Sequence, residues 1–171
     1  MEPTGVSRTP AVDTRVFRET MARFATGITV VTAPAADGPH GVTINAFASL
    51  SLAPALVLIC IEQGRYTLEV LEAARVFAVN VLAEGQEHLS RFFSNDSRPE
   101  GPSAFDGIPH RAGRLAPLLE GCLAVAECRV TARFPGGDHT IFVGQVEAAE
   151  VFPGRRPLVY YDRGYRGLTG V

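Results

Sequence analysis

The segment from Gly41 to Ser51 combines small polar residues with a strand-like spacing, and this combination could hold a ligand. If its first half is a β-strand, alternate side chains share one face, so the polar groups on that face point the same way. The residues concerned are Thr43, Asn45, Phe47, Ser49 and Ser51. With backbone N–H groups at the strand end, they could bind a phosphate or the polar edge of a planar heterocycle. An ordinary amphipathic strand in water shows the same alternation, and polarity alone favours that interpretation.

A second candidate is the loop Gly136-Gly137-Asp138-His139, at the tip of a predicted hairpin. Two glycines let the backbone approach another molecule closely, and Asp138 could orient the imidazole of His139. His139 would then stand at the mouth of whatever the fold binds. A solvated hairpin turn is the alternative, since Gly and Asp are common turn residues.

The stretch from Tyr160 to Leu168 interleaves tyrosines with arginines. Aromatic rings and guanidinium planes together can stack on a flat ring system and pair with phosphate. The same pattern could bind single-stranded nucleic acid. The formal net charge of −2 and the lack of an evident basic groove argue against that, so we expect no nucleic-acid partner.

The elements that position these residues follow from hydrophobic periodicity and turn residues. Helical spacing predicts a helix from Thr14 to Ala25, with Gly27 as its left-handed stop. Two more helices and seven strands are expected: helices Thr67–Ala74 and Glu87–Phe93, and strands Ile28–Thr32, Gly41–Phe47, Ala55–Ile61, Val76–Leu82, Cys122–Phe134, Thr140–Phe152 and Val159–Tyr161. Ala55–Ile61 and Val76–Leu82 are typical of strands buried on both faces. The Pro-, Gly- and Ser-rich stretch 94–116 is too long for a simple connection, so we expect it to wrap the surface, carry function, or both.

Hairpins without regular β-α alternation predict a mainly β fold with short helices, arranged as a largely antiparallel β-barrel. A doubly wound sheet is disfavoured. No composition shift marks a second domain, so we expect one domain over residues 14–171 and a flexible leader over residues 1–13.

Composition excludes several function classes. The 171 residues are 46% hydrophobic, and all sixteen basic residues are arginine, so Schiff-base, P-loop and pyridoxal chemistry are impossible. No apolar run approaches the roughly 20 residues that span a bilayer, and the N-terminus lacks a signal peptide's apolar core, so we expect no membrane partner and a cytoplasmic location. Three cysteines without CxxC spacing are expected to be reduced core thiols, and four scattered histidines predict no metal site.

Five blocks of the sequence, taken together, resemble the flavin reductase family, the small NAD(P)H:flavin oxidoreductases of two-component monooxygenases. The blocks occur in the family's order between about Thr14 and Leu168: Phe17–Thr32, Gly41–Leu52, Phe77–Leu82, Gly137–His139 and Pro157–Tyr161. The resemblance implies a split antiparallel β-barrel of the FMN-binding type. It also implies a homodimer that binds FMN or FAD near the subunit interface.

The resemblance also implies which residues form the site. The flavin segments would supply Thr43, Asn45, Ala46, Ser49 and Ser51, followed by Cys60, Ile61, Gln63, Arg65 and Thr67. Arg65 is the expected phosphate ligand because a guanidinium can grip phosphate with two hydrogen bonds. His139 resembles the family histidine that contacts the nicotinamide nucleotide. Tyr165 and Arg166 resemble the tail segment that closes over this nucleotide. Phe92 resembles a residue that packs either on the cofactor or in the core.

The function implied is reduction of FMN or FAD by NADH or NADPH, with hydride passing from nicotinamide C4 to flavin N5 and the reduced flavin passing to a partner oxygenase. The cofactors carry this chemistry and the protein positions them, which explains the absence of a catalytic triad. The alternative is a flavin-binding electron carrier or sensor without a nucleotide site. The Gly137-Asp138-His139 loop argues against that alternative, since a carrier needs no nucleotide-contacting loop.

Overall fold

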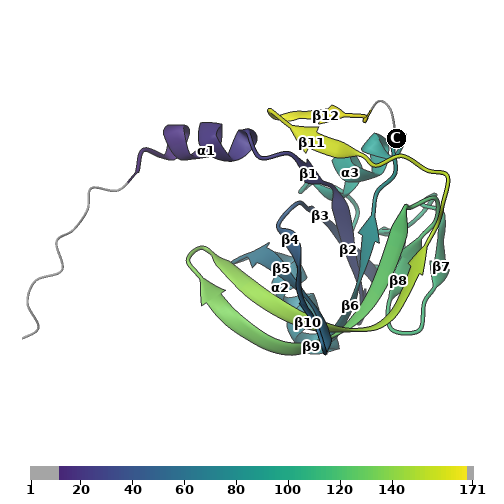
Figure 1. The fold of residues 1–171 in the computed structure, drawn as a ribbon. Coiled ribbons are helices and arrows are strands. Elements are labelled where there is room, and N and C mark those ends of the chain that lie inside the picture. The colour runs from purple at the N-terminus through teal and green to yellow at the C-terminus, as the bar shows by residue number, and fades with distance from the viewer. Residues whose placement is uncertain (1–11, 169–171) are drawn as a thin grey trace, which may run out of the picture.

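A computed structural model describes residues 12–168 of the chain (Figure 1). Most of the expected leader, residues 1–11, and the last three residues, 169–171, lie outside the described part. Within residues 12–168, no helix is both long and apolar enough to cross a bilayer.

The main element is a seven-stranded antiparallel sheet, which confirms the predicted mainly β fold. Its strands, in spatial order, are β3 (Gly38–Ile44), β2 (Thr29–Ala35), β6 (Val76–Val81), β9 (Ala124–Gly136), β10 (His139–Val151), β5 (Ala55–Glu62) and β4 (Phe47–Leu52). Two small sheets flank it: β1 (Thr26–Gly27), β11 (Val159–Tyr161) and β12 (Gly164–Arg166) in one, and β7 (His110–Ala112) with β8 (Pro117–Leu119) in the other.

The sheet curls but does not close into a barrel, because its two end strands, β3 and β4, are not paired with each other (Figure 1). These two strands are consecutive in the chain and are joined by Asn45 and Ala46. The expected single strand Gly41–Phe47 is therefore wrong. The chain turns at Asn45, whose carbonyl accepts a hydrogen bond from the Phe47 N–H at 3.0 Å, and then pairs with β5 at the opposite end of the sheet.

Two core clusters lie on opposite sides of β2 and β6. Val30 and Ala78 contribute to one cluster, and Val31 and Val79 to the other, so both strands are buried on both faces as expected for Val76–Leu82. The same expectation for Ala55–Ile61 is wrong. In β5 only alternate residues are fully buried, because one face of this strand is not covered by the core.

The helices α2 (Tyr66–Ala74) and α3 (Glu87–Phe93) agree with the predicted ranges to within one residue. The stretch 94–116 wraps the surface through a 3₁₀ turn, η1 (Gly101–Ser103), and β7. It is anchored by buried Ala104, Phe105 and Ala116 in the first core cluster.

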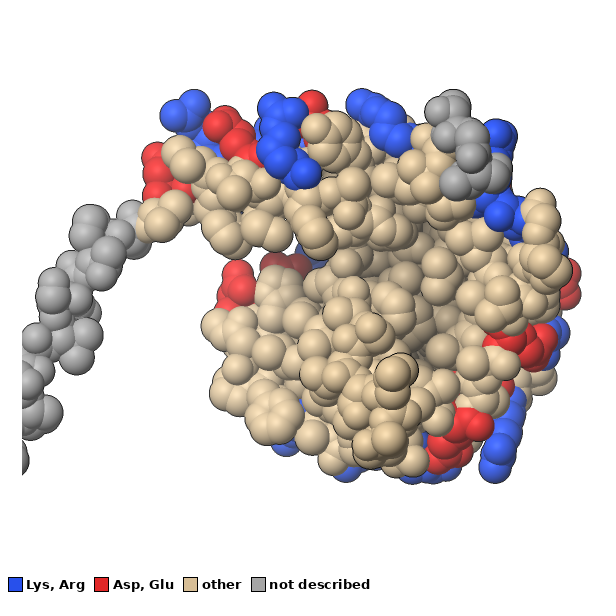
Figure 2. All heavy atoms as spheres, in the orientation of Figure 1, with Lys and Arg blue, Asp and Glu red and all other residues tan. Residues whose placement is uncertain are grey.

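Helix α1 (Thr14–Ala22) is shorter than predicted and has no buried residue. Asp13 caps its start by accepting hydrogen bonds from the backbone N–H groups of Arg15 and Val16 at 2.7 and 3.3 Å. Gly27 is not its stop, because the helix ends before Arg23 and Gly27 pairs in β1 with normal backbone angles. Figure 2 shows α1 projecting from the body, with charged side chains outward and uncharged side chains toward the hollow beneath it.

Candidate functional site

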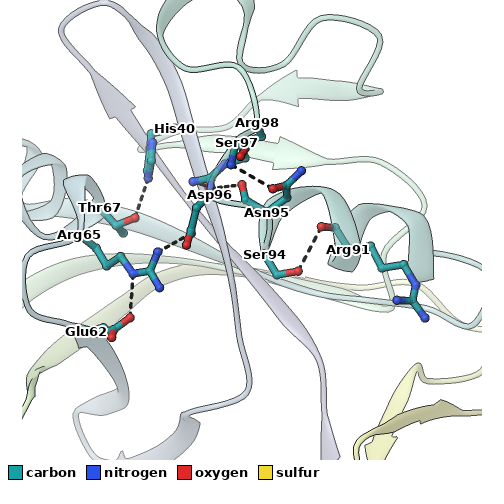
Figure 3. A network of polar contacts seen from close by, with 11 residues as sticks. His40, Glu62, Arg65, Thr67, Arg91, Ser94, Asn95, Asp96, Ser97 and Arg98 are labelled. Carbon is teal, nitrogen blue, oxygen red and sulfur yellow. Dashed lines mark hydrogen bonds and ion pairs between the residues drawn. The ribbon is translucent and has the colours of Figure 1, made fainter.

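A cavity of about 360 Å³ opens where the main sheet is split. It lies between the end of β3, the β5–α2 connection, the segment after α3 and the start of β10. Seven of its lining residues are apolar or aromatic: Val42, Ile44, Ala46, Cys60, Ile61, Tyr66 and Phe93. The other lining residues are His40, Thr43, Asn45, Glu62, Gly64, Arg65, Thr67, Ser94, Asp96, Arg98, Glu100 and His139, and Figure 3 shows that His40, Glu62, Arg65, Thr67, Asp96 and Arg98 lie together. The cavity therefore offers a slot with apolar walls that ends in charged groups.

The structure brings eight of the predicted site residues together around this cavity: Thr43, Asn45, Ala46, Cys60, Ile61, Arg65, Thr67 and His139. Gly41 makes room beside them, because a Cβ at this position would lie 2.6 Å from the ring of Phe93. Burial raises the pKa of the Cys60 thiol, so this group stays protonated at neutral pH. The expectation of three core thiols holds for buried Cys122 and Cys128, whereas Cys60 lines the cavity.

The other six predicted residues do not line it: Ser49, Ser51, Gln63, Phe92, Tyr165 and Arg166. Ser49 and Ser51 are separated by an irregularity in the pairing of β4 with β5, and Ser49 is exposed. The Gln63 side chain instead donates to the Gly137 carbonyl at 3.3 Å. Arg166 folds back to the Tyr165 carbonyl at 2.8 Å, and Phe92 packs edge-on against Phe93.

Tyr165 reaches the cavity wall indirectly through α3. Its hydroxyl lies 2.9 Å from the hydroxyl of buried Ser90, and the Ser90 carbonyl accepts a hydrogen bond from the Thr43 hydroxyl at 2.8 Å. Tyr165 of β12 and Thr43 of β3 are therefore both hydrogen-bonded to Ser90 of α3. Since the Thr43 proton is used in this bond, its oxygen lone pairs remain for a ligand donor.

The expected phosphate ligand, Arg65, is already held by two carboxylates (Figure 3). Its Nε donates to Glu62 at 2.7 Å and its Nη1 to Asp96. These hydrogen bonds raise the pKa of Arg65, led by the one to Asp96, and the same contact lowers the pKa of Asp96.

Arg98 is a cavity cation that sequence reasoning missed. Its guanidinium donates to the Gly41 carbonyl at 2.8 Å and to the Asn95 carbonyl at 3.0 Å (Figure 3). It makes no ion pair within the described residues, and burial lowers its pKa. The only signal in the sequence was an arginine within the long Pro- and Ser-rich stretch, since such stretches carry function more often than short connections do.

His40, also missed, lies at the floor of the same end. It is buried, and its Nε2 lies 2.7 Å from the Thr67 hydroxyl. Burial, assisted by Arg98, lowers the pKa of His40 to about 4, so the ring is neutral at pH 7. Tyr66 packs edge-on against it at 5.3 Å between ring centroids.

His139 begins β10, opposite Glu62 of β5, and its side chain is partly exposed. Its Nδ1 lies 2.6 Å from an Asp138 carboxylate oxygen, and this hydrogen bond lowers the pKa of Asp138. An acceptor on Nδ1 fixes the proton there and leaves Nε2 as an acceptor in the neutral ring. No set of three or more His, Cys, Asp or Glu side chains in residues 12–168 is arranged to hold a metal ion.

The donor set fits a flavin. The apolar walls suit a planar ring system, the exposed residues Asn45 and Ala46 suit its polar edge, and Arg65 and Arg98 supply cations for a phosphate tail. The open, curled sheet and the slot at its split together define a protein that positions a planar, anionic cofactor.

Comparison with known proteins identifies the family. The flavin reductase like domain matches residues 21–169, and the chain belongs to this family. It is 45% identical over 153 residues to the reductase component of 4-hydroxyphenylacetate 3-monooxygenase from Thermus thermophilus, covering 90% of this chain and 95% of the relative. It is 40% identical over 152 residues to an NADH-dependent FAD reductase from Streptomyces globisporus, covering 88% of this chain and 83% of the relative.

Solved structures agree with the sequence relatives. The flavin reductase component of a bacterial two-component tryptophan halogenase, BorF, superposes with a TM-score of 0.86 at 40% identity, covering 91% of this chain and 98% of that one. The predicted family and its split-barrel architecture are therefore confirmed.

Proposed function

We propose that this chain oxidises NADH or NADPH and reduces FMN or FAD, which then leaves for a partner oxygenase. The observation that carries the proposal is the cavity in which the Thr43–Ala46 segment, two arginines and His139 meet. The names of the relatives, a monooxygenase reductase component and an NADH-dependent FAD reductase, support it.

A bound flavin supplies the hydride acceptor for a nicotinamide ring. The protein's part is to hold both rings in contact, since positioning supplies most of the acceleration that such a reaction needs. Val42 and Ile44 of β3 and Ile61 of β5 give the slot apolar walls against which a ring system could pack, and the backbone N–H groups at Asn45 and Ala46 could donate to its polar edge. Asp138 holds the His139 ring in one tautomer, and His139 positions the nucleotide.

The test is NADH oxidation followed at 340 nm with FMN and with FAD, repeated with NADPH. No oxidation with any of the four pairs would refute the activity. In the His139→Ala variant we expect a raised KM for the nicotinamide nucleotide and nearly unchanged flavin affinity. A flavin-binding carrier or sensor would bind flavin and leave NADH and NADPH untouched.

We also propose that the chain is a homodimer, with α1 packed on a second copy. The helix exposes Val16, Phe17 and Met21, which are 46%, 55% and 49% exposed. An isolated helix of nine residues is unstable in water, and packing of this apolar face on a second copy would stabilise it. Sedimentation at micromolar concentration tests this, and a single species of the 18.3 kDa chain mass would refute it.

A cytoplasmic location remains part of the proposal. Its support is that Cys60, Cys122 and Cys128 are free thiols, as expected in a reducing compartment. Fractionation of the cells that make the protein would test it, with recovery among exported proteins as the contrary result.

A further inference from the structure

The ion pair between Arg65 and Asp96 joins two loops at the charged end of the cavity. Arg65 precedes α2 directly, whereas Asp96 lies in the loop after α3, 31 residues further along the chain. Both residues line the cavity, and Figure 3 shows the Asp96 carboxylate directed at the guanidinium from the side opposite Glu62. This contact therefore forms part of the site wall.

The charge at this end does not favour an anion as it stands. Five charged side chains line it, two of them cations and three of them carboxylates: Arg65, Arg98, Glu62, Asp96 and Glu100. Counted as formal charges, they leave an excess of one negative charge. A phosphate that enters here meets carboxylates as well as guanidinium groups, so its attraction to the arginines is partly cancelled.

Two of the five N–H donors of the Arg65 guanidinium are engaged by carboxylates. Nε is bonded to Glu62 and Nη1 to Asp96, and a two-point grip on phosphate uses neighbouring donors of the same fork. A phosphate that takes the fork containing Nη1 therefore meets the Asp96 carboxylate already bound there. Asp96 is the freer of the two carboxylates, because its side chain is 69% exposed on a loop, whereas the Glu62 side chain is 51% exposed and its backbone is paired in β5 opposite His139.

We propose that Asp96 is a specificity-determining residue that competes with the flavin phosphate for Arg65. The inference rests on the proposed function and deepens it, because it concerns the same site. When the phosphate-bearing flavin enters, its phosphate replaces the Asp96 carboxylate on Arg65. When the flavin leaves, Asp96 returns and restores the ion pair. The competition weakens the hold on phosphorylated flavins and leaves the ring system's own contacts unchanged.

A reductase that passes its product to another enzyme benefits from such competition, since a tightly held flavin would not leave. The simpler alternative is that Asp96 only pins the loop after α3. The two roles predict different effects on flavins with and without a phosphate. A pinning role affects the binding of any flavin, whereas competition affects only flavins that carry phosphate.

The test compares FMN with riboflavin, which has the same ring and ribityl chain but no phosphate. Dissociation constants are measured by quenching of flavin fluorescence for the wild type and for Asp96→Asn. We expect Asp96→Asn to bind FMN about three- to tenfold more tightly, as expected from the loss of one exposed counter-charge, and riboflavin within about twofold of the wild type. Asp106→Asn is the matched control, because Asp106 is an exposed aspartate of the same long stretch that does not line the cavity.

The same substitution in a chain without Arg65 tests whether Arg65 is the group for which Asp96 and the phosphate compete. In an Arg65→Gln chain, adding Asp96→Asn should no longer tighten FMN, because no guanidinium remains there to share. Equal changes for FMN and riboflavin, no change for FMN, or an undiminished effect without Arg65 would each overturn the inference. Failure of the wild type to bind either flavin would instead refute the proposed function, and this inference with it. Unchanged melting temperatures verify that every variant is folded.

Discussion

Replacing His40 by glutamine should remove a specific part of the acid sensitivity of this fold. The ring is buried beneath the cavity, with Thr67, Tyr66 and Arg98 around it. Burial is the main cause that lowers its pKa from 6.5 to about 4, Arg98 adds to it, and Asp37 opposes it. The folded chain therefore takes up a proton on His40 only at a pH well below that at which the unfolded chain does.

The sign and size of the effect follow from this difference. A histidine with a depressed pKa contributes stability that is fully present above pH 6.5 and is lost as the pH falls toward 4. One unit of pKa difference corresponds to about 1.4 kcal/mol, so the full contribution is about 3 kcal/mol. Between pH 7 and pH 5 the unfolded chain becomes almost fully protonated at this site and the folded chain does not, which costs about 2 kcal/mol.

The measurement is the free energy of unfolding in urea at pH 7 and pH 5, at one fixed protein concentration so that any association is the same throughout. The wild type should lose about 2 kcal/mol more over this interval than His40→Gln does. Other titrating groups are common to both chains and cancel in the comparison. His88→Gln, which removes an exposed histidine of α3, is measured in the same way as the matched control. An identical loss in the wild type and His40→Gln would refute the account of His40.

Three further changes test other parts of the structure. Asn80→Leu should destabilise the fold by about 2–5 kcal/mol in urea unfolding. The buried carboxamide donates to the Val30 carbonyl and the Thr32 hydroxyl and accepts from the Leu119 N–H, so these groups would lose their partner. A loss below about 1 kcal/mol would contradict this account. Gly41→Ala should cost about 1–3 kcal/mol in the same assay, since its Cβ would lie 2.6 Å from the buried Phe93 ring, and the double variant Gly41→Ala with Phe93→Leu should recover part of that loss. Phe17→Glu should yield monomers in sedimentation with little change in monomer secondary structure, because the side chain is 55% exposed in the single chain, whereas a dimer that survives the change would place the interface elsewhere.

The long elements of the fold could be predicted from the sequence, because local signals define them. The alternation in β9 and β10 and the apolar run in β5 are strong over eight or more residues. Among the three-residue strands, β11 was predicted from its apolar and aromatic residues, whereas β7, β8 and β12 were not, since their sequences carry no such local signal. The break at Asn45 and Ala46 was hidden because the alternation of Thr43, Asn45 and Phe47 continues through it, although the pairing partner changes from β2 to β5.

The candidate site was predicted in part for a similar reason. The resemblance identified the segments around Thr43 and Arg65, which belong to regular elements or lie beside them. It did not identify Asp96 or Arg98, because the loop after α3 has no periodicity and its course depends on where η1 and buried Phe105 pack. That Arg65 is paired with carboxylates also has no local signal, since Glu62 is close in sequence but Asp96 is 31 residues away.

The separation of β3 and β4 affects how the protein matures. They follow one another in the chain, yet five other strands, β2, β6, β9, β10 and β5, lie between them in the sheet. The two edge strands therefore reach opposite sides of the slot only after the chain as far as β10 has folded, and the long-range strand pairing that this needs is intrinsically slow. A growing chain on the ribosome has no slot to offer, so the ability to bind a planar ligand between these edges would report that the molecule has finished folding.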